Sequence, residues 1–164
     1  MPSLSHNARV LGVLSALPLW MAAASKAPEQ PIKFSHKRHA AFSLACKACH
    51  PGAATAERAG MPAAVQCMQC HANIQKHKGL IQQLAAFQKE EKAVPWVRVY
   101  RLPDFVFFSH ARHVNSVACA KCHGPVERRE ALAAEIVHNM RTCMDCHRSR
   151  RASIQCHACH ELGR

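Results

Sequence analysis

The chain has 164 residues, with 22 Lys and Arg against 10 Asp and Glu, 13 His and 10 Cys. This length accommodates one or two small domains. Hydrophobic residues make up 49% of the chain but aromatic residues only 5%. Its own side chains would therefore form a thin core, because large aliphatic and aromatic groups carry most of the burial energy. The composition excludes collagen, a low-complexity tail and a polytopic membrane protein, since there is a single long apolar run.

That apolar run, VLGVLSALPLWMAAA at residues 10–24, follows Arg9 and leads into small residues. As a helix it would span roughly 22 Å, which is short of the roughly 30 Å of a bilayer's hydrocarbon core. Pro18 also interrupts it. We therefore expect residues 1–27 to be a secretory signal peptide, with an uncleaved N-terminal anchor as the alternative. Either one places the protein outside the cytoplasm.

All ten cysteines fall into five C-x-x-C pairs, and His follows every pair: CKACH, CMQCH, CAKCH, CMDCH and CHACH. C-x-x-C-H is the attachment signature of c-type haem. Two thiols at this spacing reach the two vinyl groups on one porphyrin edge, and the adjacent imidazole binds the iron. The expected thioether residues are Cys46, Cys49, Cys67, Cys70, Cys119, Cys122, Cys143, Cys146, Cys156 and Cys159. The expected proximal iron ligands are His50, His71, His123, His147 and His160.

Three other uses of C-x-x-C fit less well. A structural zinc site usually joins two such pairs, and five pairs leave one without a partner. A disulfide framework has no use for the His that follows each pair. A thioredoxin-like motif occurs once per domain beside a βαβ pattern, which is absent from this sequence. The sequence therefore predicts five covalently bound haem c groups.

Five haems would also make up for the thin core, since roughly 27 residues per haem remain after residues 1–27 are set aside. We expect a compact, mostly α and irregular fold with the haems as its core. Short helices would end near each C-x-x-C-H, and minor short strands would precede the F-S-H motifs described next. The excess of Lys and Arg would balance haem propionates, so a nucleic-acid partner is not expected.

Two segments, PIKFSHKRHA at 31–40 and DFVFFSHARHV at 104–114, share the pattern F-S-H-x-x-H ahead of a C-x-x-C-H. A second C-x-x-C-H follows in each half. The pattern predicts a duplicated two-haem unit at 28–78 and at 103–147, with the fifth haem appended within 103–164 and a linker at 79–102. Phe34 and Phe107 lie on apolar, extended stretches that can pack on a ring face.

The two histidines of each F-S-H-x-x-H pattern are three residues apart on one helical turn, so they point in similar but not identical directions and suit two different haems. His36, His39, His110 and His113 are therefore expected distal ligands. His138 is favoured as the fifth because it closes an amphipathic stretch before CMDCH, and Met140 and His157 are its rivals. His77 is better explained as an ordinary surface histidine.

In the linker, GLIQQLAAFQKEEKA at 79–93 predicts a helix with Leu80, Leu84 and Phe87 on its apolar face, ended by Pro95. We expect that face to pack on a haem or on the neighbouring half, with contact to a partner subunit as the alternative.

F-S-H-x-x-H ahead of C-x-x-C-H resembles the class III multihaem cytochromes, of the c3 and c7 types. In that family the first His of the pair binds the haem of the following C-x-x-C-H, and the second binds another haem. The resemblance implies that His36 caps the haem of His50 and that His110 caps that of His123. His39 and His113 would then reach neighbouring haems.

A longer resemblance runs through VPWVRVYRLPDFVFFSHARHV at 94–114, AGMPAAVQCMQCH at 59–71 and NMRTCMDCHRSR at 139–150. These segments are similar to the pentahaem cytochrome subunit of alternative complex III, a quinol-oxidising membrane assembly with a molybdoenzyme-like partner. The resemblance implies iron–sulfur or molybdoenzyme-like partners and membrane quinol-oxidising subunits.

These patterns predict a periplasmic electron carrier and not an enzyme, either soluble or attached to the outer face of the inner membrane. The alternative is a cytochrome subunit of a membrane quinol-oxidising complex. A multihaem reductase is a remote alternative, because the chain is too small to build an open haem with a polar catalytic pocket.

Overall fold

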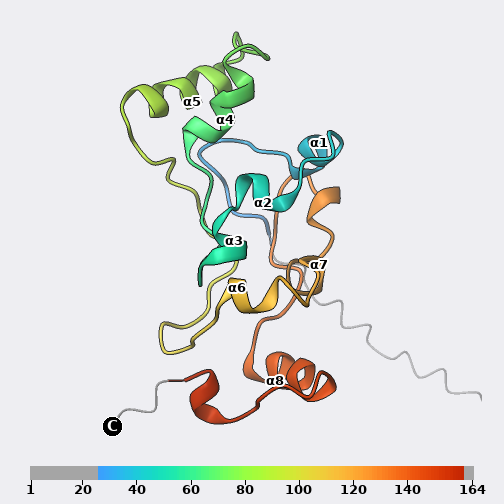
Figure 1. Ribbon diagram of the computed structural model, residues 1–164. Coiled ribbons are helices and arrows are strands. Elements are labelled where there is room, and N and C mark those ends of the chain that lie inside the picture. The colour runs from blue at the N-terminus through green and yellow to red at the C-terminus, as the bar shows by residue number, and fades with distance from the viewer. Residues whose placement is uncertain (1–25, 161–164) are drawn as a thin grey trace, which may run out of the picture.

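The structure, a computed structural model, describes residues 26–160. The predicted signal peptide, apart from its last two residues, lies outside the described residues. Short helices joined by irregular segments make up the described chain (Figure 1). The helices are α1 (His36–Ala40), α2 (Cys46–Cys49), α3 (Gly52–Thr55), α4 (Ala64–His71), α5 (Gly79–Lys89), α6 (His110–His113), α7 (Ala120–His123), the 3-10 helix η1 (Val126–Arg128), α8 (Met140–Ser149) and the 3-10 helix η2 (Cys156–Ala158).

The predicted mostly α and irregular fold is confirmed, but the short strands expected before each F-S-H are not found in residues 26–160. In their place an isolated antiparallel bridge joins Val106 to His160. The segment before α6 thus pairs with the last C-x-x-C-H over one residue pair, which is too short to make a ladder. Within 26–160, no helix has the length and apolar character needed to cross a membrane.

Polar caps start two of the helices that carry functional motifs. The Ser35 hydroxyl accepts a hydrogen bond from the Arg38 N–H at 3.1 Å and begins α1. The Asn139 side chain accepts from the Thr142 N–H at 2.9 Å and begins α8. Short polar side chains at this position satisfy backbone donors that a helix leaves free at its start.

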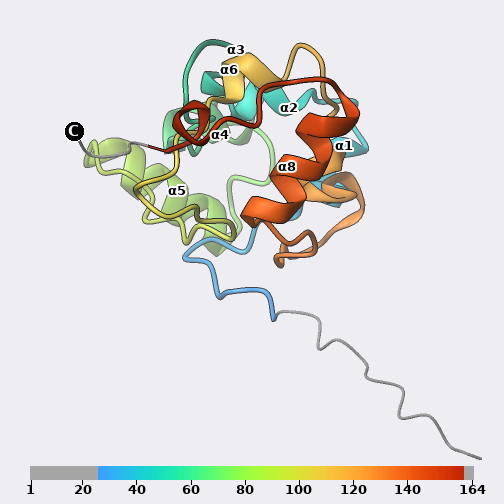
Figure 2. The ribbon, with the colours of Figure 1, turned by 90° about the horizontal axis from the view of Figure 1, so that it is seen from below.

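The hydrophobic core of the polypeptide is small and lies between α4 and α5. Its buried members are Ile32, Ala64, Ile81, Leu84 and Val94. The helix predicted in the linker is present as α5, but its buried face is centred on Ile81 and Leu84, while Leu80 is 39% exposed. α5 packs on α4 of the first half, side by side with it in Figures 1 and 2.

The two segments predicted to be repeated units touch through backbone hydrogen bonds. The Lys37 N–H of α1 donates to the Arg129 carbonyl after η1 at 3.0 Å, and the N–H groups of His110 and Ala111 in α6 donate to the carbonyls of Glu57 and Ala56 at 3.0 Å. Each segment therefore provides carbonyl acceptors for a helix of the other.

Candidate haem-binding site

The five C-x-x-C-H motifs lie on five separate short helical elements. They occupy α2, the end of α4, α7 with its preceding residue Cys119, the middle of α8, and η2. Within each motif a helical turn brings the first Cys close to the His, as the 2.9 Å hydrogen bond from the His50 N–H to the Cys46 carbonyl shows in the first. All ten thiols are free and at least partly accessible. Each motif thus presents two thiols and an imidazole from one compact turn, which is what attachment of a haem edge requires.

The backbone fixes which ring nitrogen most of the predicted ligands offer. Because a carbonyl oxygen only accepts hydrogen bonds, an Nδ1 bonded to one carries the proton, and Nε2 then keeps its lone pair for a metal. Seven of the predicted ligands have Nδ1 within 2.6–3.2 Å of a backbone carbonyl: His39, His50, His71, His110, His113, His147 and His160.

In three pairs, the imidazole of a C-x-x-C-H motif lies close to an imidazole of F-S-H-x-x-H. The ring centroids are 6.1 Å apart for His39 and His71, 6.1 Å for His113 and His147, and 6.3 Å for His110 and His123. A metal lying between two Nε2 atoms, with metal–nitrogen bonds of roughly 2 Å, places the ring centroids roughly 6 Å apart. The three spacings therefore fit an iron bound by both imidazoles.

A fourth pair, His36 and His50, is close enough to interact electrostatically. Burial, followed by the neighbouring rings of His50 and His39, lowers the pKa of His36 to about 4. Burial and the rings of His138, His110 and His50 likewise lower the pKa of His123. Both side chains are therefore neutral at neutral pH, the form that binds metal.

His138 lies beside His123 and not beside His160. Its ring centroid is 6.2 Å from that of His123 with the planes at 82°, and it stacks on Tyr100 at 4.6 Å. Its Nε2, unlike that of the seven histidines above, is bound to the Cys122 carbonyl at 2.7 Å. No ring contact joins His138 to His160 in the described part of the chain, so its role as fifth distal ligand stays a prediction.

Aromatic side chains orient the second histidine of each F-S-H-x-x-H pattern. Phe34 stacks on His39 at 4.3 Å, and Phe108 stacks on His113 at 4.4 Å in the same way. Phe108, and not the predicted Phe107, is thus the counterpart of Phe34, because it directly precedes the Ser of the motif. The sequence did not identify Tyr100 as a partner of His138, because a single Tyr in an extended segment indicates no particular contact.

The chemistry around the motifs also fits a large apolar group. Burial is the leading cause that raises the thiol pKa of Cys67, Cys122 and Cys143. Large apolar side chains flank the motifs, yet the polypeptide itself leaves them 44–78% exposed. They include Phe42 and Leu44 before the first motif, Val65 before the second, Val137 and Met140 before the fourth, and Ile154 before the fifth. Five porphyrins placed at these motifs would cover such side chains, which supports the donor set as a haem site.

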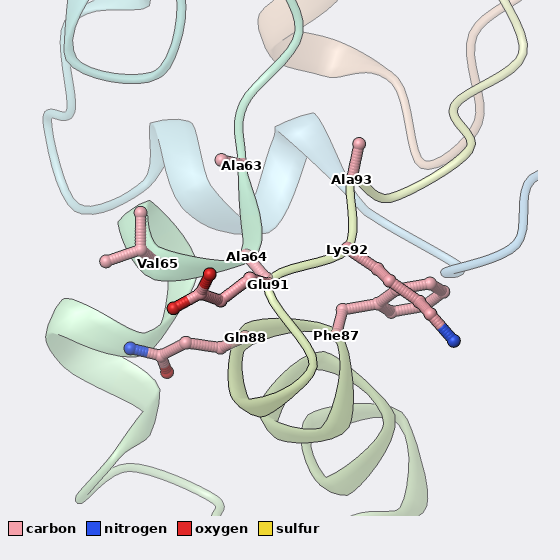
Figure 3. A pocket seen from close by; sticks show the side chains of 8 residues that line it. All are labelled: Ala63, Ala64, Val65, Phe87, Gln88, Glu91, Lys92 and Ala93. Carbon is pink, nitrogen blue, oxygen red and sulfur yellow. The ribbon is translucent and has the colours of Figure 1, made fainter.

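A pocket of about 530 Å³ lies between α4 and α5 (Figure 3). It is lined by Ala63, Ala64, Val65, Phe87, Gln88, Glu91, Lys92 and Ala93. None of these is Cys or His, so the lining contributes no thiol or imidazole to the haem-binding set.

Comparison with known proteins gives two family matches and one relative. Residues 19–99 match the class III cytochrome c family, and residues 106–161 match cytochrome c7 and related cytochromes c. Over 102 residues the chain is 37% identical to the multiheme cytochrome c subunit of menaquinone reductase from Nitratidesulfovibrio vulgaris. The alignment covers 61% of this chain and 48% of that protein, so the chain spans about half the length of this relative.

Proposed function

We propose that the chain is a multihaem c-type cytochrome, to which its matches with the class III and c7 families point, and that it transfers electrons through five covalently bound haems in the periplasm. The observation that carries this proposal is the set of three imidazole pairs with centroids 6.1–6.3 Å apart. Haem c, when bound, supplies a one-electron ferric/ferrous couple.

The residues of the chain set the properties of that couple. The thiols would hold each haem at one edge, and the paired imidazoles would both bind its iron, which would favour electron exchange over binding of an outside ligand. The carbonyls bound to Nδ1 hold each ring in place and increase its basicity as a ligand. Electron transfer of this kind needs no general acid, base or nucleophile.

We propose the ligand set as predicted from the sequence, with three pairings taken from the ring spacings and the fourth from the electrostatic interaction of His36 with His50. His39 pairs with His71, His113 with His147, His110 with His123, and His36 with His50. His160 is the proximal ligand of the fifth site, and these four pairings assign no distal ligand to it.

The test is the holoprotein, matured in a host that attaches haem c. We expect five haems per chain by pyridine haemochrome and mass spectrometry, and low-spin ferric signals from at least four of them by quantitative electron paramagnetic resonance. Replacing Cys156 and Cys159 by Ser should reduce the count to four. A mature protein that carries no haem, or that holds zinc at these cysteines, would overturn the proposal.

A more specific setting is a quinone-linked membrane complex, which the 37% identical relative favours. The resemblance to alternative complex III implies quinol oxidation, whereas the relative is named as part of a menaquinone reductase. A chain of one-electron centres conducts in either direction, so its partners would set the direction of flow. Co-purification with membrane subunits after detergent extraction supports this setting, and complete release of a lone chain by osmotic shock contradicts it.

A further inference from the structure

We propose that the five C-x-x-C-H sites form a single line whose order differs from their order in the sequence: 67–71, 46–50, 119–123, 143–147, 156–160. This inference rests on the proposed function, because it assigns a path through the same five sites. The first site in the chain becomes internal, and the second becomes an end.

Within the first half, α1 joins two sites because it provides an imidazole to each. The His39 ring centroid lies 6.1 Å from that of His71, and His36, three residues earlier on the same helix, is close enough to His50 for their charges to interact. The sites at 67–71 and 46–50 are therefore neighbours. The electrostatic contact between the thiols of Cys67 and Cys49 agrees with this.

The second half repeats the arrangement through α6. His110 faces His123 at 6.3 Å, and His113 faces His147 at 6.1 Å. The thiol of Cys122 interacts with that of Cys146. The sites at 119–123 and 143–147 are therefore neighbours as well.

The two halves meet at the first site of each. The thiols of Cys46 and Cys119 are close enough to interact, and His50 is close enough to His123 to act on its charge. The Glu57 carbonyl, in the loop after the first motif, accepts hydrogen bonds from both the N–H and Nδ1 of His110. If the sites were arranged in space in their sequence order, 67–71 would lie next to 119–123. None of these contacts joins those two sites.

The fifth site extends the line beyond the fourth. Cys143 and Cys159 interact electrostatically, while the Cys159 carbonyl accepts from the Phe107 N–H at 2.8 Å, so η2 is held beside the second half. In Figure 1, α4, α2, α7 and α8 follow one another from the top of the molecule to the bottom, and the red segment that carries η2 lies beside α8 near the C-terminus. Figure 2, seen from below, has α8 at the near side.

This order makes 67–71 and 156–160 the two ends at which electrons enter and leave. At each internal step one electron would pass from a ferrous to a ferric iron, so one centre would be oxidised as its neighbour is reduced. An electron that crosses the molecule must pass the junction between 46–50 and 119–123.

Electron paramagnetic resonance on the haem-loaded full chain tests the order. His110→Ala opens the iron at 119–123 and creates a high-spin centre, which speeds the spin relaxation of its neighbours. Low-spin signals are assigned by their loss in His36→Ala, for 46–50, and in His39→Ala, for 67–71. We expect the high-spin centre at 119–123 to affect the 46–50 signal strongly and the 67–71 signal weakly. The reverse result overturns the proposed order.

His39→Ala is the matched control, because a high-spin centre at 67–71 should affect 46–50 and leave 119–123 nearly unchanged. If a variant fails to load haem, nuclear Overhauser contacts between haem protons in the unsubstituted protein decide the order. Contacts between 46–50 and 119–123 support it, and contacts between 67–71 and 119–123 contradict it. Five low-spin haems coupled in another order would refute this inference alone, whereas absence of haem would refute the proposed function.

Discussion

At the scale of single residues, the position of one ring nitrogen decides what a histidine can bind. His113 has Nδ1 bound to the Ser109 carbonyl at 2.7 Å, its face stacked on Phe108, and its ring 6.1 Å from that of His147. His77 has no ring contact among the residues that the structure describes. The two histidines of the same chain should therefore respond differently to removal.

We predict that His113→Ala opens one iron. In the haem-loaded variant one low-spin ferric signal should be replaced by a high-spin signal, and the reduced protein should bind carbon monoxide at that site, because an axial position has become free. Added imidazole should restore the low-spin signal. His77→Ala should change neither readout. An unchanged spectrum of His113→Ala would show that this residue is not a ligand.

Gly52 lies at the start of a segment whose carbonyls bind two of the predicted haem ligands. A Cβ added at Gly52 would lie 2.5 Å from the Arg58 carbonyl oxygen. The loop that this glycine opens carries the Gly60 carbonyl, bound to Nδ1 of His50, and the Glu57 carbonyl, bound to Nδ1 of His110.

We predict that Gly52→Ala lowers the free energy of unfolding by about 1–3 kcal/mol, because the backbone must move to relieve the clash. Denaturant unfolding of the holoprotein measures it. Gly79→Ala is the control, since a Cβ there meets nothing within 4 Å and the change should stay below about 1 kcal/mol. Equal losses in both variants would contradict the argument.

At the scale of elements, the duplicated motifs differ in how their helices begin. Ser35 caps α1 through its bond from the Arg38 N–H, whereas Ser109 makes no side-chain cap at the start of α6. We predict that Ser35→Ala destabilises the holoprotein by about 1 kcal/mol. Ser109→Ala should change stability by no more than about 0.5 kcal/mol. A larger effect at Ser109 than at Ser35 would refute the assignment of the cap.

The packing of α5 on α4 gives a prediction for the small core. Leu84 is 4% exposed and Leu80 is 39% exposed on the same helix. Leu84→Ala should cost about 2–5 kcal/mol, because the site is enclosed and leaves a cavity. Leu80→Ala should cost distinctly less. Because Cys67 and Met68 pack against this core, Leu84→Ala should also perturb the haem signal of the site at 67–71, which His39→Ala identifies.

The sequence predicted those elements that can be recognised from the spacing of nearby residues. The five motifs, the two F-S-H-x-x-H segments and a helix near 79–89 could be read from spacing alone. The buried face of that helix was predicted imperfectly, because Leu80 and Ile81 are adjacent and only the position of α4 decides which one is buried. Phe107 and Phe108 are adjacent and both aromatic, so the sequence alone did not show that Phe108 is the one that stacks on His113.

Long-range relations could not be read from the sequence. Spacing along the chain says nothing of the contact between His138 and His123 or of the stack on Tyr100, since these depend on how separate segments meet. The same holds for the hydrogen bond from His110 to Glu57, which spans the two halves. In a chain whose own core is this small, cofactors and backbone bonds determine such contacts more than hydrophobic patterning does.

At the scale of the whole molecule, the two halves are joined on one side by polar contacts between α1 and the segment after η1. Arg38 and Glu130 form an ion pair at 3.5 Å, beside the hydrogen bond from the Lys37 N–H to the Arg129 carbonyl. A hydrogen bond from Ser35, together with the charges of Arg38 and Lys37, lowers the pKa of Glu130. This carboxylate therefore links the stability of the junction to pH.

The direction of this pH dependence follows from the difference between the folded and unfolded pKa of the carboxyl group. A carboxyl whose pKa is lower in the folded protein stabilises the fold above its ordinary pKa of 4.5, and this contribution is lost as pH falls through the lower folded value. We predict that Glu130→Gln is less stable than the unsubstituted holoprotein at pH 7, and that the difference shrinks steadily below pH 4.5. Denaturant unfolding across this range measures it. Glu90→Gln is the control, because Glu90 pairs with Lys92 in its own segment and spans no junction. A difference for Glu130→Gln that is independent of pH would show that the ionised carboxylate does not hold the halves together.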